Sequence, residues 1–298
     1  MKNASSIKDR LANYSKKNDK LFSDVLNVYV LERVLFRISK SNFADNFTLK
    51  GGILLYGLYE NSFTRATTDI DLLAKNISNS KSKLKDVFSK ILSISTDDPI
   101  KFDIDNLEVN DIKKSSEYHG ARISTTAYLD RTRIHVSIDI GFGDVVYPNR
   151  VTMNYPTILN EESPIMFAYS TYSIISEKIE AIVALGLINS RYKDFYDICL
   201  ICENEDFDGM VLRESLIETF SNRNTSFGEI VAFNEDFVKD SERCVRWKGF
   251  IKRKRVEDTR SFSDVVSEIQ VFLLPVINSI RKNEEFNMTW KHKDMKWM

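Results

Sequence analysis

The sequence has few cysteines and almost no net charge, and both shortages exclude classes of protein. Cysteine occurs three times in 298 residues, at Cys199, Cys202 and Cys244, which is too sparse and odd a set for a disulfide framework. The formal net charge is −1, so the chain as a whole is not attracted to nucleic acid or to a membrane surface. Such binding would need a local patch. We expect a protein of the reducing cytoplasm.

Long apolar runs are missing as well. No stretch of about 18 apolar residues appears, so we expect no membrane span. The polar segment 1–20 lacks the apolar centre of a signal peptide. The sequence shows no internal repeat and no low-complexity segment. Its composition, 43% hydrophobic and 29% charged, is typical of a globular protein with one large or two moderate domains.

The pair Cys199 and Cys202 has the spacing of half a zinc site. No second pair of ligands follows at suitable spacing, and His119, His135 and His292 are far apart in the sequence. We interpret the two thiols as buried side chains of a helix.

The hydrophobic pattern of the first half is mixed. Residues 21–40 carry apolar side chains at helical spacing, and 80–95 favour a second helix. Short strands are expected at 46–50 and around Asp71, and 100–142 reads as strands throughout. In the last expected strand, at 133–142, apolar and polar side chains alternate most regularly. Its apolar face carries Ile134, Val136, Ile138 and Ile140, and its polar face carries His135, Ser137 and Asp139.

The pattern of the second half is helical, because the strand signal stops after about residue 160. The expected helices span 168–186, 190–204, 209–222, 227–247 and 261–282. We place the domain boundary near residues 150–165.

A glycine pair and an aspartate pair form the first candidate site. Gly51 and Gly52 follow the expected strand 46–50, and Asp69 and Asp71 belong to the next expected strand. Strand side chains alternate between faces, so the two aspartates point the same way and repel each other. A glycine turn before a helix suits phosphate, and paired carboxylates suit Mg²⁺ with substrate phosphates. The pattern predicts a site for a nucleoside triphosphate with metal.

A third carboxylate follows in the last expected strand. If that strand lies beside the strand of Asp71, Asp139 joins the pair, and three carboxylates can hold two metal ions and deprotonate an attacking hydroxyl. Asp144 is a competing third ligand. A solvent-exposed Asp139 without a ligand role is the plain alternative.

The helical half carries a lysine among apolar residues and a pair of acids. Lys178 lies mid-helix, where it snorkels to the surface or reaches a phosphate as a point charge. Asp194 and Asp197 share one face of the next helix, and Arg191 and Lys193 flank them. Salt bridging on a helix surface is the plain interpretation of this group considered alone.

Together these segments resemble the AbiEii/AbiGii type of nucleotidyltransferase-like toxins, the toxin halves of bacterial type IV toxin–antitoxin pairs linked to abortive phage infection. The family pattern is Gly-Gly or Gly-Ser, Arg-x-Ser/Thr-x-Asp-x-Asp, Glu-Lys-x-x-Ala and Arg-x-Lys-Asp-x-x-Asp. All four occur in order, as Gly51-Gly52, Arg65-x-Thr67-x-Asp69-x-Asp71, Glu177-Lys178-x-x-Ala181 and Arg191-x-Lys193-Asp194-x-x-Asp197. The resemblance covers roughly residues 45–200.

The chain departs from the wider superfamily after its glycine pair. Where that superfamily has Gly-Ser and a short gap, Ile53 follows Gly52 and the gap to Asp69 is longer. Thr67 or Thr68 is therefore a candidate for the hydroxyl that contacts the phosphates.

The resemblance implies an α/β (α+β) protein with two domains. Residues 1–160 would form an N-terminal helix and a DNA-polymerase-β-like nucleotidyltransferase core with a mixed sheet. Residues 161–298 would form a helical domain that completes the nucleotide site.

The implied activity is a metal-dependent transfer of a nucleoside monophosphate from an NTP, GTP being one candidate, to RNA, with tRNA as the leading acceptor. The effect of such a toxin on the cell would be growth arrest in phage defence. We expect a cytoplasmic monomer with a cognate antitoxin. The alternative is an NTP- or RNA-binding protein of the same fold that acts through a partner without transfer. An RNA nuclease would also use two metals, but it would need no triphosphate-binding lysine.

The resemblance also assigns roles to residues. The implied catalytic residues are Asp69, Asp71, Lys178 and Asp194. The implied ligands of Mg²⁺ or Mn²⁺ are Asp69, Asp71 and Asp139. The implied nucleotide-binding residues are Gly51, Gly52, Arg65, Thr67, Thr68, Lys178 and Lys193.

A basic segment at 243–255 bears on the acceptor. Its candidate RNA-binding residues are Arg246, Lys252, Arg253, Lys254 and Arg255. Trp247 and Phe250 lie between the basic residues, and this mixture suits an RNA backbone with stacked bases. A helix with a basic outer face and both aromatic rings in the core fits the same pattern.

Overall fold

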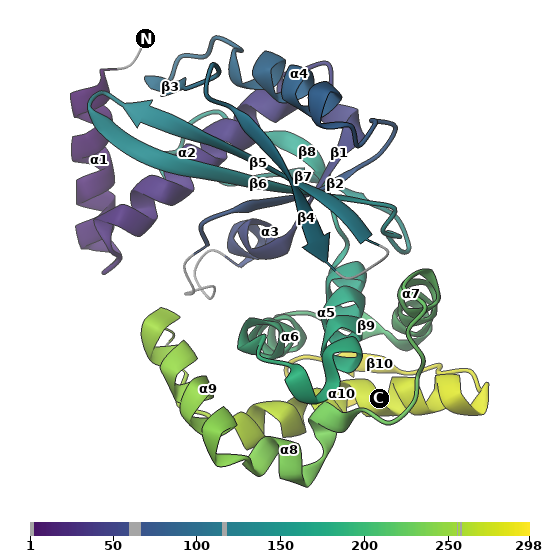
Figure 1. Cartoon of the computed structure of the whole chain (residues 1–298). Coiled ribbons are helices and arrows are strands. Elements are labelled where there is room, and N and C mark those ends of the chain that lie inside the picture. Colours follow the sequence, from purple (N-terminus) through teal and green to yellow (C-terminus); the bar gives the residue numbers. More distant parts are fainter. Residues whose placement is uncertain (1–2, 60–66, 115–117, 255, 257) are drawn as a thin grey trace. The chain divides into compact units, whose positions relative to one another are not determined.

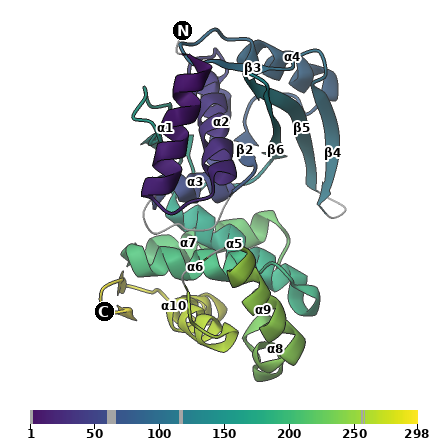
Figure 2. The same cartoon turned by 90° about the vertical axis from the view of Figure 1, so that its left-hand side faces the viewer.

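The computed structural model describes residues 3–59, 67–114, 118–254, 256 and 258–298 (Figures 1 and 2). Contacts divide the chain into two compact units. The first unit comprises Met1–Glu60, Ala66–Gly143 and Val151–Ala168, and the second comprises Asn61–Arg65, Asp144–Arg150 and Tyr169–Met298. The division of the sequence at residues 160 and 161 into two functional domains stays a prediction.

The first unit is built on an eight-stranded sheet with the order β3-β5-β6-β2-β1-β8-β7, and β4 pairs with β5 outside that path. The strands are β1 (Phe47–Lys50), β2 (Ile70–Ala74), β3 (Ile100–Phe102), β4 (Glu108–Lys114), β5 (Tyr118–Leu129), β6 (Thr132–Phe142), β7 (Val151–Asn154) and β8 (Ile165–Ala168). The sheet is mixed, because β2 runs parallel to β6 and β1 parallel to β8, while the other pairs are antiparallel.

The alternating pattern of β6 is confirmed. Ile134, Val136, Ile138 and Ile140 are all buried, so this strand contributes one full face to the core. The hairpin to β5 turns at Asp130, whose backbone φ of 55° lies in the left-handed region that aspartate tolerates better than most residues. Residues 130 and 131 alone separate the two strands.

Four helices accompany this sheet: α1 (Ala4–Lys17), α2 (Phe22–Ser39), α3 (Gly51–Leu58) and α4 (Lys81–Leu92). α2 packs on β6 and β8 and contacts α1 and α4. It is buried nearly all round, and even Arg37 lies in the interior, where its guanidinium forms two 3.0 Å hydrogen bonds to the Asp98 carboxylate. The hydrophobic pattern predicted the helix at 21–40 but not α1, of which only the side chains of Ile7, Leu11 and Ser15 are buried.

The second unit is largely helical. Its helices are α5 (Thr171–Leu185), α6 (Tyr192–Asn204), α7 (Gly209–Asn222), α8 (Glu235–Lys239), α9 (Ser241–Lys254) and α10 (Phe262–Lys282). A small sheet is formed by β9 (Phe207–Asp208), β10 (Thr289–Lys291) and β11 (Lys296–Trp297). The expectation that strands end after residue 160 is therefore wrong: β8 and this small sheet follow, in runs of two to four residues that carry no period-2 signal.

α10 forms the core of the second unit. It is the one helix among the described residues that is long and apolar enough to cross a membrane by length and composition. Its apolar side chains at Val265, Ile269, Phe272 and Val276 are fully buried inside the unit, which is the arrangement of a core helix. Cys199 and Cys202 are buried free thiols on α6, so the interpretation of this pair as core residues is confirmed.

Candidate functional site

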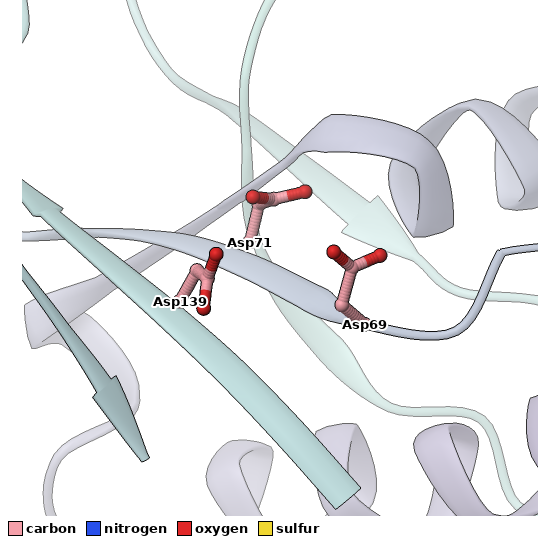
Figure 3. Close-up of side chains that lie close together, drawn as sticks. All are labelled: Asp69, Asp71 and Asp139. Carbon is pink, nitrogen blue, oxygen red and sulfur yellow. The ribbon is translucent and has the colours of Figure 1, made fainter. Parts of the chain in front are cut away.

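Three aspartates meet on the sheet of the first unit (Figure 3). Asp69 directly precedes β2, Asp71 lies within it, and Asp139 lies on β6. β2 and β6 pair in parallel with Asp71 opposite Asp139. One carboxylate oxygen from each of the three residues lies within 4.8 Å of the others. Carboxylate oxygens are the ligands that Mg²⁺ prefers, so the triad has the chemistry and the spacing of a divalent-metal site.

Gly51 gives Asp71 the room to join this triad. Its φ of +73° begins α3 directly after β1, and glycine adopts such a φ without strain. A Cβ at this position would lie 1.9 Å from Oδ2 of Asp71. The Asp71 carboxylate thus packs against the Gly51 backbone at the start of α3, where helix N–H groups lack intrahelical partners and can bind an anion.

Arg122 is the cation beside the triad. It lies on β5 directly opposite Asp139, and its Nε and Nη2 donate to the two Asp139 oxygens at 2.7 and 2.8 Å. The bidentate bond to Asp139 is the main cause that raises the pKa of the Arg122 guanidinium, and the nearby charges of Asp69 and Asp71 raise this pKa further. Arg122 was not named from the sequence, because the strand register that pairs it with Asp139 is the signal that reveals it.

The two threonines that precede the Asp-x-Asp segment differ in burial. Thr67 is buried, and its hydroxyl has no hydrogen-bond partner within the described part of the chain. Thr68 is exposed. Arg65 lies outside the described residues. A buried hydroxyl without a partner usually requires an explanation, and a phosphate oxygen of a ligand would satisfy it.

The second unit holds Lys178 between two buried acids. Its Nζ lies 3.2 Å from Asp194 and 2.6 Å from Asp197, and Arg191 donates to Asp194 at 2.6 Å. Burial alone would raise the pKa of the Asp194 carboxyl, but Lys178 and Arg191 outweigh it and hold this pKa below its usual value. The surface salt bridging considered from the sequence is therefore the wrong description, since both acids are buried and the lysine is nearly so. Lys193 is exposed.

Asp144 takes part in a different cluster of the second unit. Nη2 of Arg223 lies 2.9 Å from Asp144 and 3.0 Å from Glu177, and Nη1 lies 2.8 Å from Glu180. These acids raise the pKa of the Arg223 guanidinium against the effect of its burial. Of the two candidates for a third ligand, Asp139 is the one that the described structure groups with Asp69 and Asp71.

The basic segment forms α9 and divides into two faces. Trp247 and Phe250 are buried, and the indole N–H of Trp247 donates to the Arg260 carbonyl at 3.0 Å. Their rings are core residues and are not available to stack on bases, so of the two interpretations the helix with both aromatic rings in the core describes this segment. The exposed basic side chains are Arg246, Lys248, Lys252 and Arg253. The Lys254 side chain and Arg255 lie outside the described residues.

A mixed sheet presents aspartates from neighbouring strands, with a glycine turn beside them. This fold is shared with the solved structure of a nucleotidyltransferase toxin. The solved structure of MenT4, a nucleotidyltransferase toxin from Mycobacterium tuberculosis H37Rv, has a TM-score of 0.52 at 11% identity, over 92% of this chain and 99% of that chain. The structure of JHP933 from Helicobacter pylori has a TM-score of 0.50 at 14% identity, over 87% and 94%. The predicted fold class is confirmed.

The sequence identifies the family within this class. Residues 33–268 match the family described as nucleotidyl transferase AbiEii toxin of type IV toxin–antitoxin systems. The chain belongs to this family and is an enzyme of the nucleotidyltransferase type, and membership implies a cognate antitoxin. A search of curated proteins finds no match to the sequence.

Proposed function

We propose that this toxin transfers a nucleoside monophosphate from an NTP to an RNA acceptor, with tRNA as the first candidate, and thereby arrests growth in phage defence. The observation that carries the proposal is the triad of Asp69, Asp71 and Asp139, of which one oxygen each lies within 4.8 Å of the others beside the Gly51 turn. A binding protein without transfer activity has no need to hold three carboxylates so close, because their mutual repulsion is unfavourable without a cation.

The residues of the first unit would bind the reacting phosphate. The three aspartates would hold Mg²⁺ or Mn²⁺, and the bound ion would supply positive charge for the developing charge on the phosphate. Backbone N–H groups at Gly51 and Gly52 and the buried Thr67 hydroxyl would donate hydrogen bonds to phosphate oxygens. Arg65 and Thr68 remain proposed contacts from the motif.

The residues of the second unit would bind the triphosphate and its leaving pyrophosphate. Lys178 would donate from an ammonium group whose position is fixed by two buried carboxylates. Asp194 would be the acid that holds this ammonium in place, and Lys193, which is exposed, would approach the phosphates as a point charge. Such a reaction depends on positioning and charge neutralisation more than on a covalent intermediate.

The acceptor would bind along the basic face of α9. Arg246, Lys252 and Arg253 are exposed on this helix, and Lys254 and Arg255 continue the basic run in sequence. Phosphate contacts from such residues are independent of base sequence. We further propose a cytoplasmic monomer, with GTP as the first donor to test.

The test is a labelling experiment with a matched control. The purified protein is incubated with Mg²⁺, total tRNA and each α-labelled NTP in turn, and the same is done for Asp69→Asn and Asp105→Asn. Asp105 is an exposed carboxylate of the same unit outside the triad. We expect label to move to RNA with the wild type and Asp105→Asn, and at least about 100-fold less with folded Asp69→Asn, because a metal ligand is lost. Saturable NTP binding without label on any RNA would favour the binding alternative.

A further inference from the structure

The triad of the first unit brings three negatively charged groups close together. Three carboxylates meet within 4.8 Å, and Asp139 among them is buried. Carboxylates this close destabilise one another, and protonation or a cation must relieve them. Arg122 forms a close ion pair with Asp139, its Nε lying 2.7 Å from Oδ1.

Arg122 and Asp139 form a bidentate hydrogen-bonded ion pair. Both Asp139 oxygens accept, one from Nε and one from Nη2, which is the strong bidentate geometry of an arginine–carboxylate pair. The two residues face each other across β5 and β6, so the sheet register itself places the guanidinium. Its side chain is 48% exposed while that of Asp139 is 10% exposed, so the arginine can leave the carboxylate more easily than the carboxylate can leave the sheet.

The two oxygens that Arg122 binds belong to the carboxylate that approaches Asp69 and Asp71. A divalent cation that uses an Asp139 oxygen must therefore share that oxygen with a positive group already bound to it. The two cations compete for the same negative charge.

Resting on the metal site of the proposed function, we propose that Arg122 is an internal counter-ion of Asp139. It stabilises the metal-free protein by binding both oxygens of Asp139, and it weakens divalent-metal binding by competing for them. Arg122 is thus a positioning residue that sets the metal concentration at which the site fills. It holds the Asp139 carboxylate in place beside Asp69 and Asp71 until a divalent ion arrives.

Competition and orientation predict opposite changes in metal affinity when Arg122 is removed. If Arg122 only oriented Asp139 as a ligand, its removal would weaken metal binding, as loss of an outer-shell partner does. If it competes, its removal strengthens metal binding, because the repulsion between the guanidinium and the ion is gone. The metal-free protein should lose stability in the same variant.

The experiment measures metal affinity and metal-free stability without any substrate. Wild type, Arg122→Met, Arg122→Gln and Arg122→Lys are titrated with Mn²⁺ while the free ion is followed by electron paramagnetic resonance. Thermal unfolding is recorded by circular dichroism in EDTA and in saturating Mn²⁺. The matched control is Arg133→Met, an exposed arginine opposite Tyr128 on the same strand pair, about 20 Å along β6 from Asp139.

We expect Arg122→Met and Arg122→Gln to bind Mn²⁺ about tenfold more tightly or better. Both should unfold at a lower temperature in EDTA and close to the wild-type temperature in saturating Mn²⁺. Arg122→Lys keeps the charge and should stay near the wild type in affinity, and Arg133→Met should match the wild type in both readouts. Arg122→Gln, which can still donate one hydrogen bond, serves if the methionine variant does not fold.

Two results would overturn the proposal, and they differ from a failure of the metal site itself. Uncharged Arg122 variants that bind Mn²⁺ as the wild type does, or more weakly, would make the residue inert or a ligand orienter. Unchanged unfolding in EDTA would refute the counter-ion role. If neither the wild type nor any variant bound Mn²⁺ saturably, the metal assignment of the proposed function would fall, and the Arg122 proposal with it.

Discussion

Replacing Gly51 by alanine should damage the metal site through one added methyl group. The new Cβ would lie 1.9 Å from Oδ2, 2.6 Å from Cγ and 2.7 Å from Cβ of Asp71. Contacts under 3.0 Å do not occur for real Cβ atoms, so the Asp71 carboxylate must move by more than ~1 Å. We expect Mn²⁺ affinity to fall about 10–100-fold, the range seen when a group that positions a metal ligand is changed.

The stability cost of this substitution has two sources. Alanine at a φ of +73° costs about 1–2 kcal/mol, and overpacking against Asp71 costs a further ~1–3 kcal/mol. Gly143→Ala separates them, because Gly143 has a φ of +80° and no atom within 4 Å of an added Cβ. This control should lose only the first amount and should keep its metal affinity.

Urea unfolding and Mn²⁺ titration of the two variants provide the check. We expect Gly51→Ala to be the less stable variant by ~1–3 kcal/mol and the only one of the two with weakened Mn²⁺ binding. Equal stability losses would mean that Asp71 moves aside without cost. Wild-type Mn²⁺ affinity in Gly51→Ala would show that the position of the Asp71 carboxylate does not govern the site, and the reasoning would be refuted.

Two further predictions concern the second unit. Lys178→Met should destabilise the protein by about 3–5 kcal/mol, because the buried Asp197 carboxylate loses its ion pair with the ammonium, while Asp194 retains Arg191. Adding Asp197→Asn should recover part of that loss in urea unfolding but should not recover NTP binding by calorimetry; an unchanged midpoint for the single variant would contradict the buried-pair argument. Lys252→Gln with Arg253→Gln should weaken RNA binding at low salt and reduce the salt slope by about one per lost phosphate contact; identical slopes would leave this part of α9 as a solvated surface.

The acidic site could be approached from the sequence because its elements are locally encoded. The alternation of apolar and polar side chains predicted β6, and the glycine pair marked the end of β1. These predictions made Asp139 a candidate ligand beside Asp71. The proximity of the aspartates was conditional on β2 and β6 being neighbours. That pairing is non-local, because 67 residues lie between Asp71 and its register partner Asp139 in the sequence. No local propensity specifies such a pairing.

The features that were missed depend on tertiary contacts of the same kind. Arg122 gains its role only through its register opposite Asp139. β7 and β8 are strands of four residues, too short for a periodic signal. The aromatic residues of α9 were ambiguous because amphipathic helices and RNA-binding helices both mix basic and aromatic side chains. Burial of Trp247 against Tyr192 and Phe262 resolves them as core residues.

The two charged clusters differ in balance, and the difference separates their roles. In the second unit, Lys178 and Arg191 contact the buried Asp194 and Asp197, so two cations meet two carboxylates in a largely neutral group. Such a group has little charge to spare for a triphosphate, and its lysine is held as a fixed hydrogen-bond donor. In the first unit, three carboxylates approach one another within 4.8 Å, and Arg122 pairs with one of them. Such a group favours a divalent ion. Under the proposed function, that ion would supply most of the charge that neutralises the triphosphate, and Lys178 would contribute orientation.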